Sequence, residues 1–253
     1  MAEICSSRAS FAQLTRIIEK DSVLTAAVLR RANSALYQRG CEIRSLTQAL
    51  TFLGLEDLRR FILAVSSNRS WGRIQFAPNF SRSRYSRHVL ATAVMADLLD
   101  RELGGANGGH AQVAALLHDV GRLVAAAGLK REFALITETG EWNEAREAEI
   151  FGMQHGELSA IVLRAWGMAA EVCEAVEMHH CEPAAASRPR LAAVIHAADE
   201  FAAAFVAAEE SQSGAFDESP LYGLGIDNAI PAIVAEFHRQ TAAAENGEKG
   251  CKA

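Results

Sequence analysis

Apolar residues recur along most of this chain with the period of an α-helix. The stretch 45–53, SLTQALTFL, has apolar side chains at i, i+3, i+4 and i+7, which places them on one helical face. A serine opens this stretch as a capping residue and a glycine follows it. Alternation typical of strands is weak throughout, so we predict an all-α protein. The expected helices are 9–19, 21–36, 45–53, 55–66, 83–103, 110–127, 143–151, 154–166, 169–180, 188–208 and 228–241.

Three stretches interrupt this periodicity. Residues 67–82 contain Gly, Pro, Asn and Ser at intervals, which is typical of a connection between two helical lobes. Residues 209–227 are acidic and contain Gly, Ser and Pro, so a surface loop is expected, and 242–253 lack an apolar face and should be disordered. The predicted parts are an amino-terminal helical lobe (1–68), a connecting segment (69–82), a second helical lobe (83–208), and an acidic loop, helix and disordered tail (209–253).

Composition and charge exclude several classes of function. Half of the 253 residues are apolar and the net charge is −6, which does not favour binding to nucleic acid. The five cysteines form no CxxC pair, as expected for reduced thiols in the cytoplasm. No apolar run approaches 18 residues without a charge, so no membrane span is expected. The chain is predicted to be cytoplasmic, with neither nucleic acid nor membrane as a partner.

A histidine and an aspartate stand side by side in the apolar run ALLHDVGRL, as His118 and Asp119. Burying an ionised group is costly unless it is paired or bound to a metal. One interpretation is a local hydrogen-bonded pair within the core. The other is that further histidines and aspartates meet this pair in space.

Several other histidines and aspartates are expected to point inward. His88 and Asp199 share their helical faces with apolar or small residues. A lone inward histidine is more often a hydrogen-bonded core residue than a metal ligand, and His110, His196 and His238 are interpreted in this way. Asp199 taken alone would be explained by a hydrogen bond from His196. The full inward set comprises His88, His118, Asp119, His155, His179, His180 and Asp199.

The chemistry of this set suits a transition metal. Imidazole and carboxylate groups together bind Fe, Mn, Zn or Ni, whereas a thiolate site would need cysteines that the set does not contain. From the residues alone, a metal centre and a hydrogen-bonded polar core both remain open.

The order His, His-Asp, His, His-His, Asp resembles the HD superfamily of metal-dependent phosphohydrolases, and most closely its HDOD branch. DSVLTAAVLRRANSALY (21–37) and EIRSLTQALTFLGLEDLRRFIL (42–63) are similar to the HDOD amino-terminal lobe, including its Asn-Ser-Ala triplet and Leu-Gly pair. EAEIFGMQHGELSAIVLRAWGM (147–168), followed by EAVEMHH, is similar to the family's second half. The resemblance covers roughly residues 10–208.

The resemblance implies a two-lobed helical HDOD architecture whose second lobe is an HD-type bundle. It also implies which residues bind metal. His88, His118, Asp119 and Asp199 match the superfamily's core metal set, and His155, His179 and His180 match ligands of a second ion in the branch with a Gly-Tyr-Pro motif. This chain reads HHCEP and then AAASRPRL, without Gly-Tyr-Pro, which argues against hydrolysis of cyclic dinucleotides.

Three functions follow from this resemblance. HDOD proteins are mostly bacterial signalling or regulatory modules, so the expected function is a regulatory module that holds one or two ions or a ligand and acts through a partner protein or a fused receiver or output domain. The alternative is an active phosphohydrolase in which a metal-activated water attacks a phosphate ester or nucleotide. A third is a scaffold with an empty pocket. No catalytic residue beyond the ligand set is identified.

A basic segment precedes His88 and is not part of the resemblance. Residues 58–96 contain seven arginines and no acidic residue. One interpretation is a solvated connection with scattered salt bridges. An anion site is the other interpretation, because arginine binds phosphate bidentately. The arginines expected to bind phosphate are Arg82, Arg84 and Arg87.

Overall fold

The computed structural model describes residues 45–53, 75–107, 109–138, 143–180, 189–212 and 216–249, together with the single positions 18, 25, 28, 29 and 32. These residues form α-helices and two short 3-10 helices, and no strand occurs among them. The predicted all-α fold is therefore confirmed. Apart from the single positions, the expected helices at 9–19, 21–36 and 55–66 lie outside the described residues.

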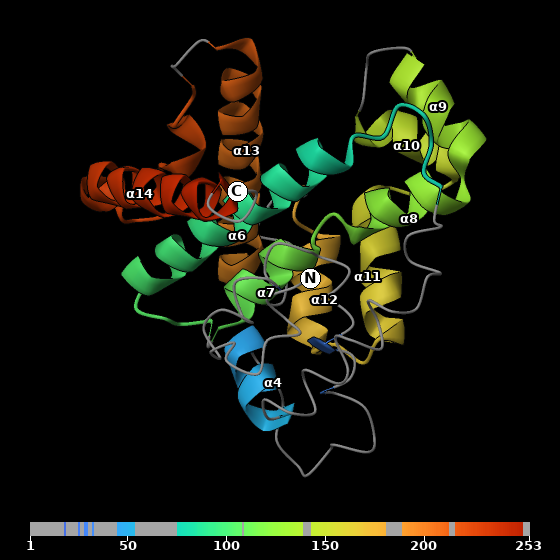
Figure 1. Cartoon of the computed structure of the whole chain (residues 1–253). Helices are drawn as coiled ribbons and strands as arrows, with labels where there is room; N and C mark the ends of the chain where they lie inside the picture. Colours follow the sequence, from blue (N-terminus) through green and yellow to red (C-terminus); the bar gives the residue numbers. More distant parts are fainter. Residues whose placement is uncertain are drawn as a thin grey trace.

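Two long helices cross at the centre of the part of the chain that the structure describes. Helix α6 (Arg82–Glu102) packs against α13 (Pro189–Ser211), and α14 (Ile230–Lys249) lies across α6 (Figure 1). Ser81 begins α6 as its N-cap, because its side chain accepts a hydrogen bond from the backbone N–H of Arg84. Helices α7 (His110–Leu117) and α12 (Ala170–Glu177) pack against these long helices and complete the core.

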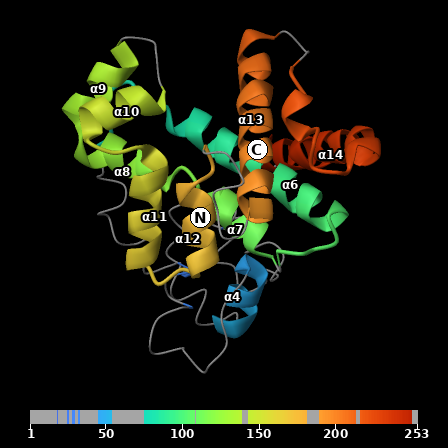
Figure 2. The same cartoon turned by 180° about the vertical axis from the view of Figure 1, so that it is seen from behind.

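Four shorter helices form a second group, on the far side of α6 from α14 in Figure 1. They are α8 (Val120–Gly128), α9 (Lys130–Glu138), α10 (Glu144–Phe151) and α11 (His155–Ala165). Helix α11 packs on both α8 and α12, as the view from behind in Figure 2 also shows, so it joins this group to the central helices.

Helix α4 (Leu46–Leu53) lies in the part of the chain that the sequence predicts to be an amino-terminal lobe. Its buried residues, among them Leu46 and Leu50, belong to the same apolar core as those of α6, α7, α12 and α13. The predicted helix 45–53 is thus present.

Helix α13 is long and apolar enough to cross a membrane when judged by length and composition alone. Within the stretch Leu191–Ser211, 61% of the most apolar 18-residue window is buried inside the protein. A core helix passes the same test, and the packing of α13 against α6 agrees with that role.

Three local features differ from the sequence prediction. The stretch 110–127 is not one helix, because it breaks at His118 and Asp119 into α7 and α8. Helix α9 was not predicted; only Phe133 and Ile136 of this helix are buried, which gives a weak periodic signal. The disordered tail expected from residue 242 is wrong as far as Lys249, because α14 continues through alanines and glutamates, which favour helix.

Candidate metal centre

His118 and Asp119 lie in the turn between α7 and α8 rather than inside a helix. The His118 ring donates through Nδ1 to the carbonyl oxygen of Ala115, at 2.7 Å, which turns its Nε2 away from α7. Asp119 occupies the N-cap position of α8, but its side chain makes no capping hydrogen bond. The helix break therefore directs both side chains into the space between α6, α11 and α13.

A close approach of α8 to α11 brings His155 to this turn. A Cβ at Gly121 would lie 2.3 Å from the carbonyl oxygen of His155 and 2.9 Å from the backbone nitrogen of Ser159, so only glycine fits here. The Ser159 hydroxyl accepts a hydrogen bond from the Gly121 N–H, at 2.8 Å. The absence of a side chain at Gly121 thus allows α11 to approach α8 closely.

The first group of polar side chains comes from α6, the α7–α8 turn and α13. The Nε2 atoms of His88 and His118 are 3.2 Å apart. Oδ1 of Asp199 lies 2.9 Å from Nε2 of His88 and 3.2 Å from Nε2 of His118. Oδ2 of Asp119 is 3.7 Å from each of the same two nitrogens. All four residues except the partly exposed His88 are buried.

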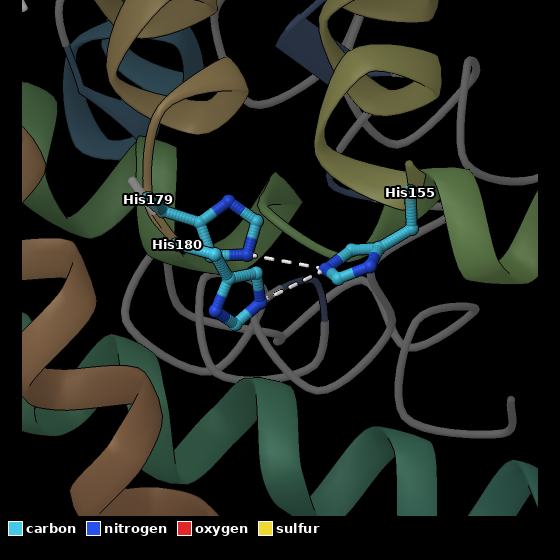
Figure 3. Close-up of side chains that lie close together, drawn as sticks. All are labelled: His155, His179 and His180. Atoms are coloured by element: carbon cyan, nitrogen blue, oxygen red, sulfur yellow. Dashed lines mark hydrogen bonds between the residues drawn. The ribbon is translucent and has the colours of Figure 1, made fainter. Parts of the chain in front are cut away.

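The second group consists of His155, His179 and His180, which Figure 3 shows with their rings turned toward one another. Nε2 of His155 lies 3.2 Å from Nε2 of His179 and 3.2 Å from Nε2 of His180. The same nitrogen is 3.2 Å from Oδ1 of Asp119, so Asp119 lies between the two groups.

Hydrogen bonds fix the orientation of the second group. Nδ1 of His179 donates to the carbonyl of Val176, and Nδ1 of His155 lies 2.7 Å from Oε2 of Glu147, which leaves each Nε2 directed into the site. Burial lowers the pKa of His179, with the neighbouring His180 acting in the same direction, and burial also lowers the pKa of His180. Both rings are therefore neutral at pH 7, and their Nε2 atoms face Nε2 of His155.

These donors fit a metal ion. Ligand atoms about 2.1 Å from one ion lie roughly 3.0–3.4 Å apart in octahedral or tetrahedral geometry, which agrees with the 3.2 Å spacings in both groups. Oδ1 of Asp119 is buried and accepts no hydrogen bond within the described part of the chain. Unpaired buried carboxylate oxygens are costly, and converging imidazole lone pairs repel one another unless a cation lies between them. Donor type, spacing and orientation all suit Fe, Mn, Zn or Ni.

The carboxylates are held in their charged form. Burial raises the pKa of Asp199, but His118 and His88 outweigh this effect and keep it well below the usual range. Burial likewise opposes ionisation of Asp119, and Arg122 with the surrounding histidines outweighs it and lowers the pKa. Burial disfavours the protonated form of His118, but Asp119 and Asp199 raise its pKa to about 9. Without a metal, His118 thus carries a proton that a metal would displace.

Arg122 and Glu147 also belong to this site, although the sequence analysis did not identify them. The Arg122 guanidinium lies 3.1 Å from Oδ2 of Asp119 and 3.6 Å from Oε1 of Glu147. Oε2 of Glu147 accepts a hydrogen bond from the backbone N–H of His155, at 2.7 Å, in addition to its contact with the ring. Arg122 could have been predicted from the sequence, because it follows Asp119 by three residues, a spacing at which helical side chains can form an ion pair. Glu147 gives no such signal, because α10 brings it to His155 only in the folded chain.

His196 lies beside the second group of side chains, but it does not make the predicted hydrogen bond to Asp199. Its Nδ1 donates to the carbonyl oxygen of His179 at 2.8 Å rather than to Asp199. This contact supports the turn that holds His179 and His180. His196 also forms a group of potential ligands with His180 and Glu200. His238 contacts the rings of Phe205 and Phe237, but it is exposed, so its interpretation as a core residue is wrong.

The three arginines of the expected anion site do not converge on one point. Arg84 and Arg87 form ion pairs with Glu210, and Arg87 also pairs with Glu209, at the end of α13. The Arg82 guanidinium lies over the ring of Phe76, 5.3 Å from its centroid. Arg84 is the one of the three that lines the pocket next to the cluster.

Comparison with known proteins agrees with this architecture. The HDOD domain family model matches residues 1–182. No curated protein matches the chain. The MmoQ response regulator of Methylococcus capsulatus is 25% identical, with 88% of this chain and 92% of that chain covered and a TM-score of 0.67. A virulence factor of Campylobacter jejuni shares the fold, with 20% identity, coverage of 87% and 85%, and a TM-score of 0.65.

Proposed function

Because the chain belongs to the HDOD domain family, we propose that it is a regulatory module whose second lobe has kept a metal-binding pocket. A signalling role is supported by the likeness to a response regulator at 25% identity over most of both chains. In this proposal the pocket binds metal and a small ligand, and the state of the pocket is communicated to a signalling protein, either a separate partner or a fused receiver or output domain.

The convergence of imidazole and carboxylate groups is the observation that supports metal binding. The first ion would be held by His88, His118, Asp199 and Asp119. The second would be held by His155, His179, His180 and the other oxygen of Asp119, which fits the position of this aspartate between the two groups. Glu147 orients His155, as outer carboxylates commonly do for metal-binding histidines.

A second candidate function is metal-dependent hydrolysis of a phosphate ester. It is favoured by a cavity of about 430 Å³ lined by His88, Asp119 and Arg122, which is open to a small molecule. Bound divalent ions polarise a phosphoryl oxygen and lower the pKa of water. The guanidinium of Arg122, oriented by Asp119 and Glu147, would bind a phosphoryl oxygen and neutralise its charge.

Metal analysis of protein purified without chelator tests the proposal. We expect one or two transition-metal ions per chain in the unmutated protein and in His238→Ala, since His238 packs among phenylalanine rings. Asp119→Ala should lose metal, because Asp119 contributes to both groups, and the melting temperature of the metal-loaded protein should fall toward that of the metal-free form.

Two results would contradict the metal site: full metal content in Asp119→Ala, or no metal in the unmutated protein under reducing conditions. A screen of phosphate esters with Mn(II) or Fe(II) separates the two functions. Turnover that Asp119→Ala abolishes would favour the hydrolase, whereas binding without turnover would favour the regulatory module.

A further inference from the structure

The cavity beside the candidate metal centre has walls of two different kinds. At one end lie His88, Asp119 and Arg122, which are polar or charged. Five of the other nine lining residues are aromatic or aliphatic: Phe80, Tyr85, Phe133, Ala203 and Val206. The remaining four are polar or charged: Asn79, Ser81, Arg84 and Thr137. A ligand that suits this cavity therefore has one anionic end and one apolar body.

The aromatic residues form a connected cluster. The ring of Phe80 lies 5.6 Å from that of Tyr85 and 5.7 Å from that of Phe133, with the latter pair edge to face at 78°. Phe76 stacks on Phe80 from the adjoining segment, at 5.1 Å. Rings at these separations prefer stacked or edge-to-face partners, so the wall favours a flat ring over an aliphatic chain.

The charged end favours an oxyanion. The Arg122 guanidinium is oriented by its contacts with Asp119 and Glu147, and its side chain is 28% exposed. Burial opposes its charge, but Asp119 and Glu147 outweigh this effect and raise its pKa, so it remains a cation. The first turn of α6 adds Ser81 and Arg84 to the lining, and the positive end of the helix dipole favours the same sign of ligand charge.

The size of the cavity limits the ligand. Its volume of about 430 Å³ lies within the range of pockets that bind small molecules. This space is sufficient for one ring system and one phosphate-like group.

We propose that this cavity binds a small molecule in which a single aromatic ring is joined to a single phosphate-like oxyanion. The ring lies along Phe80 and Phe133, and the oxyanion lies at Arg122, next to His88 and Asp119. The anionic half of this inference rests on the proposed metal centre, whereas the aromatic half rests on the cavity wall alone. The inference thereby specifies the ligand that either proposed function would use.

Phenylphosphonate and methylphosphonate are suitable probes, because they share an oxyanion that resists hydrolysis and differ only in the ring. Their affinities are measured by calorimetry on protein loaded with Mn(II), whose metal content is determined separately. Stacking on an aromatic wall is typically worth about a factor of ten in affinity. We therefore expect phenylphosphonate to bind roughly tenfold more tightly than methylphosphonate, and Phe133→Leu to reduce this ratio.

Two alanines of α13 provide a matched pair of variants. Ala203 is exposed and lines the cavity, whereas Ala207, one turn further along, is exposed and is not part of the lining. Ala203→Trp should fill the cavity and abolish phenylphosphonate binding without loss of metal. Ala207→Trp should bind phenylphosphonate as the unmutated protein does.

The outcomes distinguish this inference from the proposed function. Equal affinity for the two phosphonates in metal-loaded protein would overturn the aromatic site and leave the metal centre intact. Unchanged phenylphosphonate binding in Ala203→Trp would have the same meaning. A ring preference in protein that holds no metal would overturn only the metal centre. Absence of both metal and phenylphosphonate binding would overturn both.

Discussion

Replacing Gly121 by alanine tests how closely α8 must approach α11. The added Cβ would lie 2.3 Å from the carbonyl oxygen of His155, against about 3.4 Å for an ordinary contact, so the two backbones must separate by roughly 1 Å. The atoms in the way belong to the backbone and to the short side chain of Ser159, so a flexible side chain cannot relieve the clash. The same movement would break the hydrogen bond from Gly121 to Ser159.

The expected loss of stability follows from three contributions. Overpacking a close-packed contact costs about 1–3 kcal/mol, and the broken hydrogen bond adds about 1 kcal/mol. Alanine favours helix over glycine by about 1 kcal/mol, which offsets part of this cost. We expect the free energy of unfolding to fall by about 2 kcal/mol. For a chain of this size that lowers the melting temperature by roughly 4–8 °C.

Metal affinity should fall as well, because the movement separates His155 from Asp119. Their ligand atoms are 3.2 Å apart, and metal–ligand distances tolerate changes of only about 0.2 Å. We expect metal to be lost first from the group of His155, His179 and His180. The assay is thermal unfolding with chelator and with Mn(II), together with a count of bound ions.

Gly128→Ala is the matched control, since Gly128 ends the same helix and a Cβ there has no atom within 4 Å. It should leave stability unchanged or slightly raised and should keep its metal. If Gly121→Ala unfolds at the temperature of the unmutated protein and binds the same number of ions, the close approach of α8 to α11 is not what positions His155.

Four further predictions concern the surroundings of the candidate metal centre. Glu147→Gln should weaken metal binding about 10- to 100-fold while the exposed control Glu149→Gln does not, and equal affinities would show that Glu147 has no role in orienting His155. Because the pKa of His118 is about 9, metal binding at pH 7 should release a proton, measurable as a heat that depends on the ionisation enthalpy of the buffer; no such dependence would contradict the pKa. In the metal-free protein the same charge stabilises the fold below pH 6.5, and this contribution should be lost between pH 6.5 and about 9. Arg84→Ala should weaken phenylphosphonate binding at low salt more than Arg82→Ala does, because of these two arginines only Arg84 lines the cavity. Equal effects would favour the interpretation of the basic segment as a solvated connection.

Helical periodicity predicted the inward residues because a ligand on a core-facing helix follows the same spacing as its apolar neighbours. His88 on α6 and Asp199 on α13 illustrate this, and the long helices that hold them begin and end within a few residues of the predicted bounds. The break at His118 and Asp119 could not be predicted in the same way. Every residue from 110 to 127 tolerates helix, and the turn is determined by packing of α8 on α11.

The surroundings of the cluster depend on contacts between distant parts of the chain. Glu147 approaches His155 because the chain turns at 152–154, which brings its carboxylate to the first residue of α11. Phe80 reaches Phe133 because the Ala77 N–H donates to the carbonyl of Ala126, which fixes the segment before α6 alongside α8. Neither contact has a periodic signature in the sequence.

The break between α7 and α8 determines which groups the two oxygens of Asp119 can reach. Inside a continuous helix the side chains of His118 and Asp119 would point about 100° apart, so the two could not serve one site together. In the turn, Asp119 directs Oδ2 toward His88 and His118 and Oδ1 toward His155. An aspartate that contributes to two groups must have its two oxygens accessible from different sides. Asp119 meets this requirement as the N-cap of α8, because its side chain lies before the first turn of that helix. The same exposure of both oxygens makes Asp119 costly to bury without a cation. The broken helix therefore gives Asp119 the position that a ligand shared by two ions would need.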